Sequence, residues 1–123
     1  MIKFKSLNQS KEFLKILKKK RINTKYFTIY FARSSSSFKN NINKYLNISF
    51  VIKKNIGNAV IRNKIKRKLK SAVQKTSKEN KLIDLNHTYV IVGKNNVYKD
   101  KFALVLREVN ETFKKIKQKG GQT

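Results

Sequence analysis

Apolar and cationic positions alternate around a single helix between residues 56 and 73. Apolar side chains recur at spacings of three and four, the spacing of one buried helical stripe: Ile61, Ile65, Leu69, Ala72 and Val73. A polar and cationic set recurs at the same spacing, displaced by roughly half a turn at about 100° per residue. We call this set the cationic ladder: Arg62, Asn63, Lys66, Arg67 and Lys70. The pattern predicts a helix that packs on a core with one side and exposes cations on the other.

Three other runs have the character of strands. Residues 24–33 are rich in aromatic and β-branched side chains. Phe27, Ile29 and Phe31 alternate there with Tyr26, Thr28, Tyr30 and Ala32. Two non-polar faces on one strand imply that both are covered or that one is a binding surface. Residues 44–52 alternate similarly, and we expect a long hairpin between these two runs. Residues 87–93 are almost continuously apolar, which is typical of a buried central strand.

Helices complete the expected order. A first helix, capped by Asn8 or Ser10, runs to about Lys20. The basic helix starts with Asn58 as its N-cap and runs to about Lys75, and an amphipathic helix covers residues 100–118. Residues 34–43 are a polar connection that leaves room for one more short strand. The order α-β-β-(β)-α-β-α predicts an α/β (α+β) two-layer sandwich with a mixed sheet. We expect one domain over residues 1–119 and a flexible tail at 120–123.

Charge narrows the class of partner. The chain has 31 Lys and Arg against 6 Asp and Glu, a formal net charge of +25. Such a charge repels itself, and it indicates a polyanionic partner: nucleic acid first, an anionic membrane surface second. There is no cysteine, which excludes disulfides and zinc ribbons. A membrane-spanning helix needs about 18 consecutive apolar residues, and no apolar run in the sequence approaches that length. No secretory signal is visible, so we expect a cytoplasmic protein. We also expect no contact with a membrane and no small-molecule substrate.

Candidate catalytic groups are scarce. Among the six carboxylates only Glu108 and Glu111 are closely spaced on a predicted helix, a pattern more typical of a solvated face than of a site. His87 is the only histidine, and it has no nucleophile or acid at a recognisable motif spacing. No phosphate-binding glycine motif is present. We therefore expect no catalytic residue and no metal site in this chain, because hard cations such as Mg²⁺ need several carboxylate or carbonyl oxygens.

The ladder carries the most specific signal. It contains the string R-N-x-x-K-R-x-x-K, preceded directly by G-N-A-V. This string resembles the signature of the protein component of bacterial ribonuclease P, K-K-x-G-x-A-V-x-R-N-x-x-K-R-x-x-R. The matching residues are Lys54, Gly57, Ala59, Val60, Arg62, Asn63, Lys66 and Arg67. Three positions depart from the family pattern: Lys70 replaces an arginine, Asn55 a second lysine, and Thr88 an aspartate.

The resemblance implies a function and a set of partners. It implies an α/β sandwich with a left-handed βαβ crossover, and an endonuclease in which a large RNA subunit does the catalysis. That RNA removes the 5′ leader of precursor tRNA with Mg²⁺ bound by RNA and substrate. By position, the RNA-subunit-binding residues would be Lys54, Arg62, Asn63, Lys66, Arg67 and Lys70. The 5′-leader-binding residues would be Phe13, Leu17 and Tyr30. The implied partners are the ribonuclease P RNA subunit and precursor tRNA.

Other interpretations stay open at this point. Phe13 and Leu17 are equally explained as plain core residues, and Tyr30 as a ring that packs while its hydroxyl meets water. Charge and fold class also allow a non-catalytic RNA-binding protein, such as a ribosomal protein on a related α/β fold. A self-sufficient nuclease is disfavoured by the few carboxylates and the single histidine.

Overall fold

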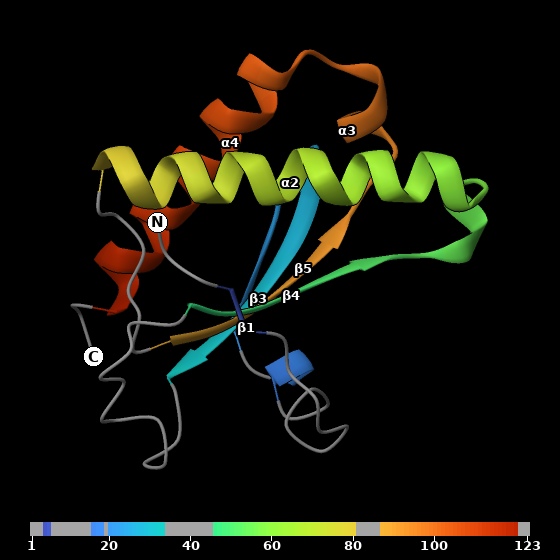
Figure 1. The fold of residues 1–123 in the computed structure, drawn as a ribbon. Coiled ribbons are helices and arrows are strands. Elements are labelled where there is room, and N and C mark those ends of the chain that lie inside the picture. The colour runs from blue at the N-terminus through green and yellow to red at the C-terminus, as the bar shows by residue number, and fades with distance from the viewer. Residues whose placement is uncertain (1–3, 6–15, 19, 34–45, 81–86, 121–123) are drawn as a thin grey trace.

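The sheet and two long helices form the body of the protein (Figure 1). The structure is a computed structural model that describes residues 4–5, 16–18, 20–33, 46–80 and 87–120. Helix α2 lies across one face of the sheet with α4 beside it. The elements are β1 (Phe4–Lys5), β2 (Lys20–Asn23), β3 (Phe27–Arg33), β4 (Leu46–Ile52), the 3₁₀ turn η2 (Lys54–Ile56), α2 (Ala59–Asn80), β5 (His87–Gly93), α3 (Asn96–Lys99) and α4 (Phe102–Gly120).

The described strands form a mixed sheet in the order β1-β4-β5-β3-β2. The pairs β1–β4 and β4–β5 are parallel, whereas β5–β3 and β3–β2 are antiparallel. Strands β4 and β5 are neighbours joined through α2, so they form the βαβ unit. The mixed α/β sandwich and its element order are therefore confirmed. The left hand of the crossover stays a prediction from the resemblance.

The expected hairpin between residues 24–33 and 44–52 is wrong. Strand β5 lies between β3 and β4, and it pairs with β3 over residues 87–93 and with β4 over residues 88–93. The physical reason is burial: β5 is the most apolar strand, and its tyrosine, valine and isoleucine at 89–91 are fully buried. The middle position of the five described strands places such a strand farthest from both edges of the sheet.

The predicted first helix is shorter at its end than expected. The sequence predicts a helix that runs to about Lys20; Ile16 and Leu17 are helical and Lys18 is a turn, but Lys20 is already the first residue of β2. A tight turn at Thr24 explains the change, because the Thr24 side chain accepts hydrogen bonds from the backbone N–H groups of Tyr26 (3.2 Å) and Phe27 (3.1 Å). This turn folds β2 back on β3. The start of the predicted helix lies outside the described residues.

Helix α2 has the two faces that its sequence predicts. Asn58 caps it, because the Asn58 side-chain oxygen accepts a hydrogen bond of 3.0 Å from the Ile61 backbone N–H. The apolar stripe is fully buried from Ile65 onward, and Ile61 is half-buried. The helix continues past Lys75 to Asn80. Thr76 is buried there, and its hydroxyl lies 2.6 Å from the Asn110 side-chain oxygen on α4, so helix packing supports the polar end.

The predictions for the last strand and the last helix hold with small shifts. Strand β5 has the predicted bounds, and α4 covers the predicted amphipathic span. The Tyr89 and Phe113 rings meet edge to face with centroids 5.2 Å apart, which joins β5 to α4. Residues 96–99 form the short helix α3 between β5 and α4. Gly120 belongs to α4, and residues 121–123 of the predicted tail lie outside the described residues.

Candidate nucleic-acid interface

The cationic ladder projects from the outer side of α2, away from the buried stripe. Asn63, Lys66, Arg67 and Lys70 are exposed, and Arg62 is half-buried. The acidic residues of the described ranges lie elsewhere: Asp100, Glu108 and Glu111 in and before α4, and Glu79 in the last turn of α2, beyond the ladder. Guanidinium groups form bidentate contacts with phosphates, and an amide can bond a base edge or a ribose hydroxyl. A row of this kind on a convex helix fits the backbone of a structured nucleic acid.

Two ladder residues have surroundings that the sequence did not reveal. The Nε atom of Arg62 is buried and has no hydrogen-bond partner within the described part of the chain. A buried donor left unpaired is costly, so turning the Arg62 side chain outward to a phosphate oxygen would relieve this cost. The Lys70 ammonium lies 6.0 Å from the centroid of the Phe50 ring on β4. The contact between Lys70 and Phe50 shows that this side of the ladder lies next to β4.

Lys54 belongs to η2, which directly precedes α2, and its side chain is exposed. The connection between η2 and the helix is tight at Gly57. A Cβ added there would lie 3.2 Å from the Ile61 side chain. The glycine therefore lets the backbone before Asn58 pack closely on the first turn of α2. This packing keeps Lys54 near the start of the ladder.

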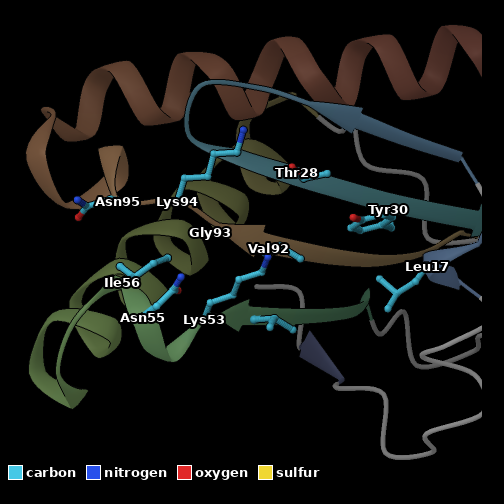
Figure 2. A pocket seen from close by; sticks show the side chains of 11 residues that line it. Leu17, Thr28, Tyr30, Lys53, Asn55, Ile56, Val92, Gly93, Lys94 and Asn95 are labelled. Carbon is cyan, nitrogen blue, oxygen red and sulfur yellow. The ribbon is translucent and has the colours of Figure 1, made fainter.

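A cleft of about 510 Å³ opens on the sheet face away from α2 (Figure 2). Its floor is a row of three side chains from neighbouring strands, because Val92 on β5 pairs with Thr28 on β3 and with Val51 on β4. The next residue, Gly93, faces the other way: a Cβ built there would lie 2.9 Å from Leu69 of α2. Alternation along β5 thus separates the helix-covered face from the cleft.

The two ends of the cleft differ in chemistry. Figure 2 shows Leu17 and Tyr30 at one end, and both side chains are half-buried. The other end is formed by the loop after β4, with Lys53, Asn55 and Ile56, and by the loop after β5, with Lys94 and Asn95. No acidic side chain is among the described residues that line it. One end is therefore apolar and aromatic, and the other is polar and cationic.

The structure brings together two of the three predicted leader-site residues. Leu17 and Tyr30 line the same cleft, and the neighbouring Ile16 is the fully packed residue of that helical turn. Phe13 lies outside the described residues. Tyr26, expected on the same strand face as Tyr30, lies before β3 and is buried in the core. Its hydroxyl donates a hydrogen bond of 2.6 Å to Asp100 Oδ2.

That hydrogen bond changes both groups that share it. It raises the pKa of Tyr26 to about 12, with burial adding to the effect. It also holds the pKa of Asp100 below its usual value, with help from the Lys25 ammonium 3.4 Å away. The Lys68 ammonium donates to the Asp100 backbone oxygen. This cluster joins the β2–β3 turn and α2 to the start of α4, so it is structural.

Sequence reasoning missed most of the polar end of the cleft. Lys53, Asn55, Lys94 and Asn95 come from two loops that are about forty residues apart in the chain. Each loop follows a strand that ends at the same edge of the sheet, since β4 and β5 are parallel. A prediction that β4 and β5 pair in parallel would have placed the two loops next to each other. From the sequence we instead expected β3 and β4 to pair as a hairpin.

In the described ranges no three His, Asp or Glu side chains gather as a possible metal site. The donor set of this part of the chain therefore does not fit a protein cage for Mg²⁺. None of the helices described is long and apolar enough to cross a membrane.

The fold and the two surfaces define a basic α/β domain with a convex cationic helix and an open lysine-rimmed cleft. Comparisons with known proteins identify its family. The family model described as Ribonuclease P matches residues 1–117. The chain is 31% identical over 107 residues to the ribonuclease P protein component of Mycoplasma mycoides subsp. mycoides, covering 86% of this chain and 90% of that protein. It is 26% identical over 119 residues to the component of Carboxydothermus hydrogenoformans, covering 96% of each.

Solved structures with the same fold agree. The RNase P protein of Thermotoga maritima, in complex with 1-(4-fluorophenyl)-2-thiourea, is similar with a TM-score of 0.65 and 22% identity, over 88% of this chain and 96% of that one. A Staphylococcus aureus RNase P protein mutant is similar with a TM-score of 0.66 and 17% identity, over 91% and 87%. The chain belongs to the ribonuclease P protein family.

Proposed function

We propose that this chain is the protein subunit of ribonuclease P, which removes the 5′ leader of precursor tRNA to give the mature 5′ end. It would bind the ribonuclease P RNA subunit and the leader at the same time, and act in the cytoplasm. Family membership over almost the whole chain supports its place in an endoribonuclease complex that processes tRNA.

The observation that carries the proposal is the presence of two unlike basic surfaces on opposite sides of one sheet. The ladder is convex and consists of long cations on one helix, so it suits the regularly spaced phosphates of a folded RNA. Lys54, Arg62, Asn63, Lys66, Arg67 and Lys70 would make these contacts. The buried Nε of Arg62 gives this surface one donor that a phosphate oxygen would satisfy once the side chain turns outward.

The cleft suits a single strand. Unpaired nucleotides are held by aromatic side chains on which bases stack and by cations that follow the phosphates. Tyr30 and Leu17 supply the apolar end, and Lys53 and Lys94 supply ammonium groups at the other. A leader entering here would reach the sheet face away from the ladder, so it would not compete with the RNA subunit for the same side chains.

Catalysis is assigned to the partner. The hydrolysis would use Mg²⁺ held by the RNA subunit and the substrate, with the ladder and Lys53 reducing repulsion between the two RNAs. The protein's own residues would bind and orient. This division of labour predicts that the protein matters most at low Mg²⁺, where fewer counterions screen the phosphates.

Reconstitution tests the proposal. The protein is mixed with a bacterial ribonuclease P RNA and a precursor tRNA at low Mg²⁺ and near-physiological salt, and cleavage at the mature 5′ end is measured. We expect a clear gain in cleavage over the RNA alone, and no cleavage by the protein alone. Absence of any gain would refute the proposal. Cleavage without the RNA subunit would instead place the chemistry in the protein.

A further inference from the structure

A hydrogen-bond network lies at the polar end of the cleft, around Asn23. Asn23 stands on β2 directly opposite Thr28 on β3. Its side-chain oxygen accepts hydrogen bonds from the Thr28 hydroxyl (2.7 Å) and from the Lys94 ammonium (2.5 Å). Thr28 and Lys94 line the cleft, whereas Asn23 does not. Asn23, outside the cleft, therefore holds one polar group from each of two residues that line it.

The network fixes what each group can still offer to a ligand. A threonine hydroxyl has one proton, and Thr28 gives it to Asn23, so its oxygen can only accept. The Lys94 ammonium has three protons and uses two, one on Asn23 and one on the backbone oxygen of Thr24 at 2.6 Å. One proton remains. The polar end thus presents an acceptor beside a donor.

The position of this network does not depend on the Asn23 side chain alone. The backbone N–H of Lys94 donates to the Tyr26 oxygen at 2.9 Å. The Asn96 side-chain amide donates to the Lys25 oxygen at 3.1 Å. These two bonds join the loop after β5 to the β2–β3 turn. Removing the Asn23 side chain should therefore change the hydrogen-bonding pattern and leave the fold in place.

Lys53 contrasts with Lys94 on the same cleft. Its side chain is exposed, and within the described part of the chain no hydrogen bond or ion pair holds its ammonium. All three of its protons remain available for phosphate oxygens. A phosphate has acceptors only, and would face the lone pairs of Thr28 unfavourably. A nucleobase edge carries a donor and an acceptor side by side, which matches the Thr28–Lys94 pair.

We propose that Asn23 is a positioning residue that makes the polar end of the cleft a reader of one leader base edge, and that phosphate binding falls to Lys53. The inference rests on the proposed function, because it takes the ligand of the cleft to be the single-stranded leader. It adds a specificity element: at one leader position the base itself contributes to affinity through hydrogen bonds to Thr28 and Lys94.

The test uses the holoenzyme, reconstituted with a ribonuclease P RNA and precursor tRNAs in which single leader positions are made abasic in turn. We expect one position where loss of the base weakens binding by roughly two- to tenfold, the range of one or two net hydrogen bonds. A 2′-deoxy substitution at that position should have little effect. A loss with the deoxy sugar and none with the abasic site would assign the donor to the ribose and overturn the proposal.

Variants of the network sharpen the test. Thr28→Val keeps the shape and removes the acceptor, so the penalty for the abasic position should shrink. Asn23→Ala should shrink it too and should increase the salt dependence of binding, because Lys94 becomes available to phosphate. Asn23→Asp keeps the accepting oxygen and should restore the penalty. Tyr98→Ala, which removes a side chain that lies outside both the cleft and the network, should leave the penalty for the abasic position unchanged.

The outcomes separate the two proposals. If a long leader binds more tightly than no leader but no position is sensitive to its base, the base-reading role of Asn23 is wrong and the leader site stands. An unchanged penalty in both Thr28→Val and Asn23→Ala would likewise overturn it. If the leader adds no affinity to the unaltered holoenzyme, the leader-binding part of the proposed function itself fails. Thermal unfolding of each variant checks that the fold is retained.

Discussion

The ladder and the cleft are both cationic, yet they are built in opposite ways. The ladder comes from a single helix, and its five residues run from Arg62 to Lys70. The cleft comes from four segments: the helical turn at 16–17, β3, the end of β4 with its loop, and the end of β5 with its loop. The first surface needs only α2 to be folded. The second exists only when the sheet is complete.

The two surfaces also differ in how their cations are used. Most ladder cations are exposed, and such contacts depend mainly on phosphate charge and salt. In the cleft, Lys94 is half-buried and already hydrogen-bonded, and Tyr30 offers a ring. Binding there should depend more on stacking and hydrogen bonds than on ionic strength. The difference indicates that one basic domain can separate tight, general RNA docking from a more selective contact.

The largest expected effect comes from removing two ladder guanidinium groups together. Arg62→Ala with Arg67→Ala should weaken binding to the RNA subunit by about 1.5–3 kcal/mol per lost charged contact. The slope of log K against log salt should fall by about 2. Filter binding at several salt concentrations measures both. Arg107→Ala, an exposed arginine on α4, is the matched control; an equal loss there would mean that only total charge matters.

Gly93→Ala adds a methyl group within the sheet that separates the ladder from the cleft, so we expect it to disturb both surfaces. Its Cβ would lie 2.6 Å from Ile52 Cδ1 and 2.9 Å from Leu69 Cδ1, so the core beneath α2 must shift. We expect Gly93→Ala to lower the free energy of unfolding by about 1–3 kcal/mol in denaturant titrations. Gly57→Ala meets only the Ile61 side chain at 3.2 Å, on extended backbone, and should cost less. The reverse order would contradict this packing.

Tyr30→Ala tests the cleft independently of the ladder. If a leader base stacks on this ring, affinity of the holoenzyme for a long-leader precursor should fall by about 1–3 kcal/mol. Affinity for leaderless tRNA and for the RNA subunit should not change. Tyr98→Ala is the control, because this tyrosine is 43% exposed, on α3, and lines no part of the cleft. Equal losses with and without a leader would count against a leader site at Tyr30.

The smallest expected effect is a pH dependence of the bond between Tyr26 and Asp100. The folded-state pKa of Asp100 is lowered, so its contribution to stability is complete above the ordinary value of 3.8 and is lost as the pH falls through the folded pKa. The pKa of Tyr26 is raised to about 12, so its contribution is complete below the ordinary value of 10.0 and is lost as the pH rises through about 12.

Denaturant unfolding of the protein and of Tyr26→Phe from pH 7 downward measures this effect. The difference in unfolding free energy between the two should be largest at neutral pH and should shrink in acid, where Asp100 is protonated. Tyr98→Phe provides a tyrosine control, because the contact of the Tyr98 ring in the described ranges is with the Lys64 ammonium and not with a carboxylate. A difference that stays constant down to pH 2 would show that the hydrogen bond does not stabilise the fold through the ionised carboxylate.

Local sequence determined much of this protein. The two faces of α2, its cap at Asn58 and the buried strand β5 all follow from periodicities of a few residues, because side chains on one helix face or one strand see the same surroundings. The ladder could therefore be located by residue before any fold was known. Leu17 and Tyr30 could be named as leader-site candidates only through the family resemblance.

Tertiary structure decided the rest. That β5 separates β3 from β4, that residues 20–23 form a strand, and that Tyr26 turns into the core depend on contacts between segments far apart in the chain. The polar end of the cleft depends on the same contacts, since Asn23 and Lys94 meet across the β2–β3 turn. Spacing along one segment carries no information about which strand ends become neighbours, so Thr28, Lys53 and Lys94 could be joined into a site only by the folded sheet.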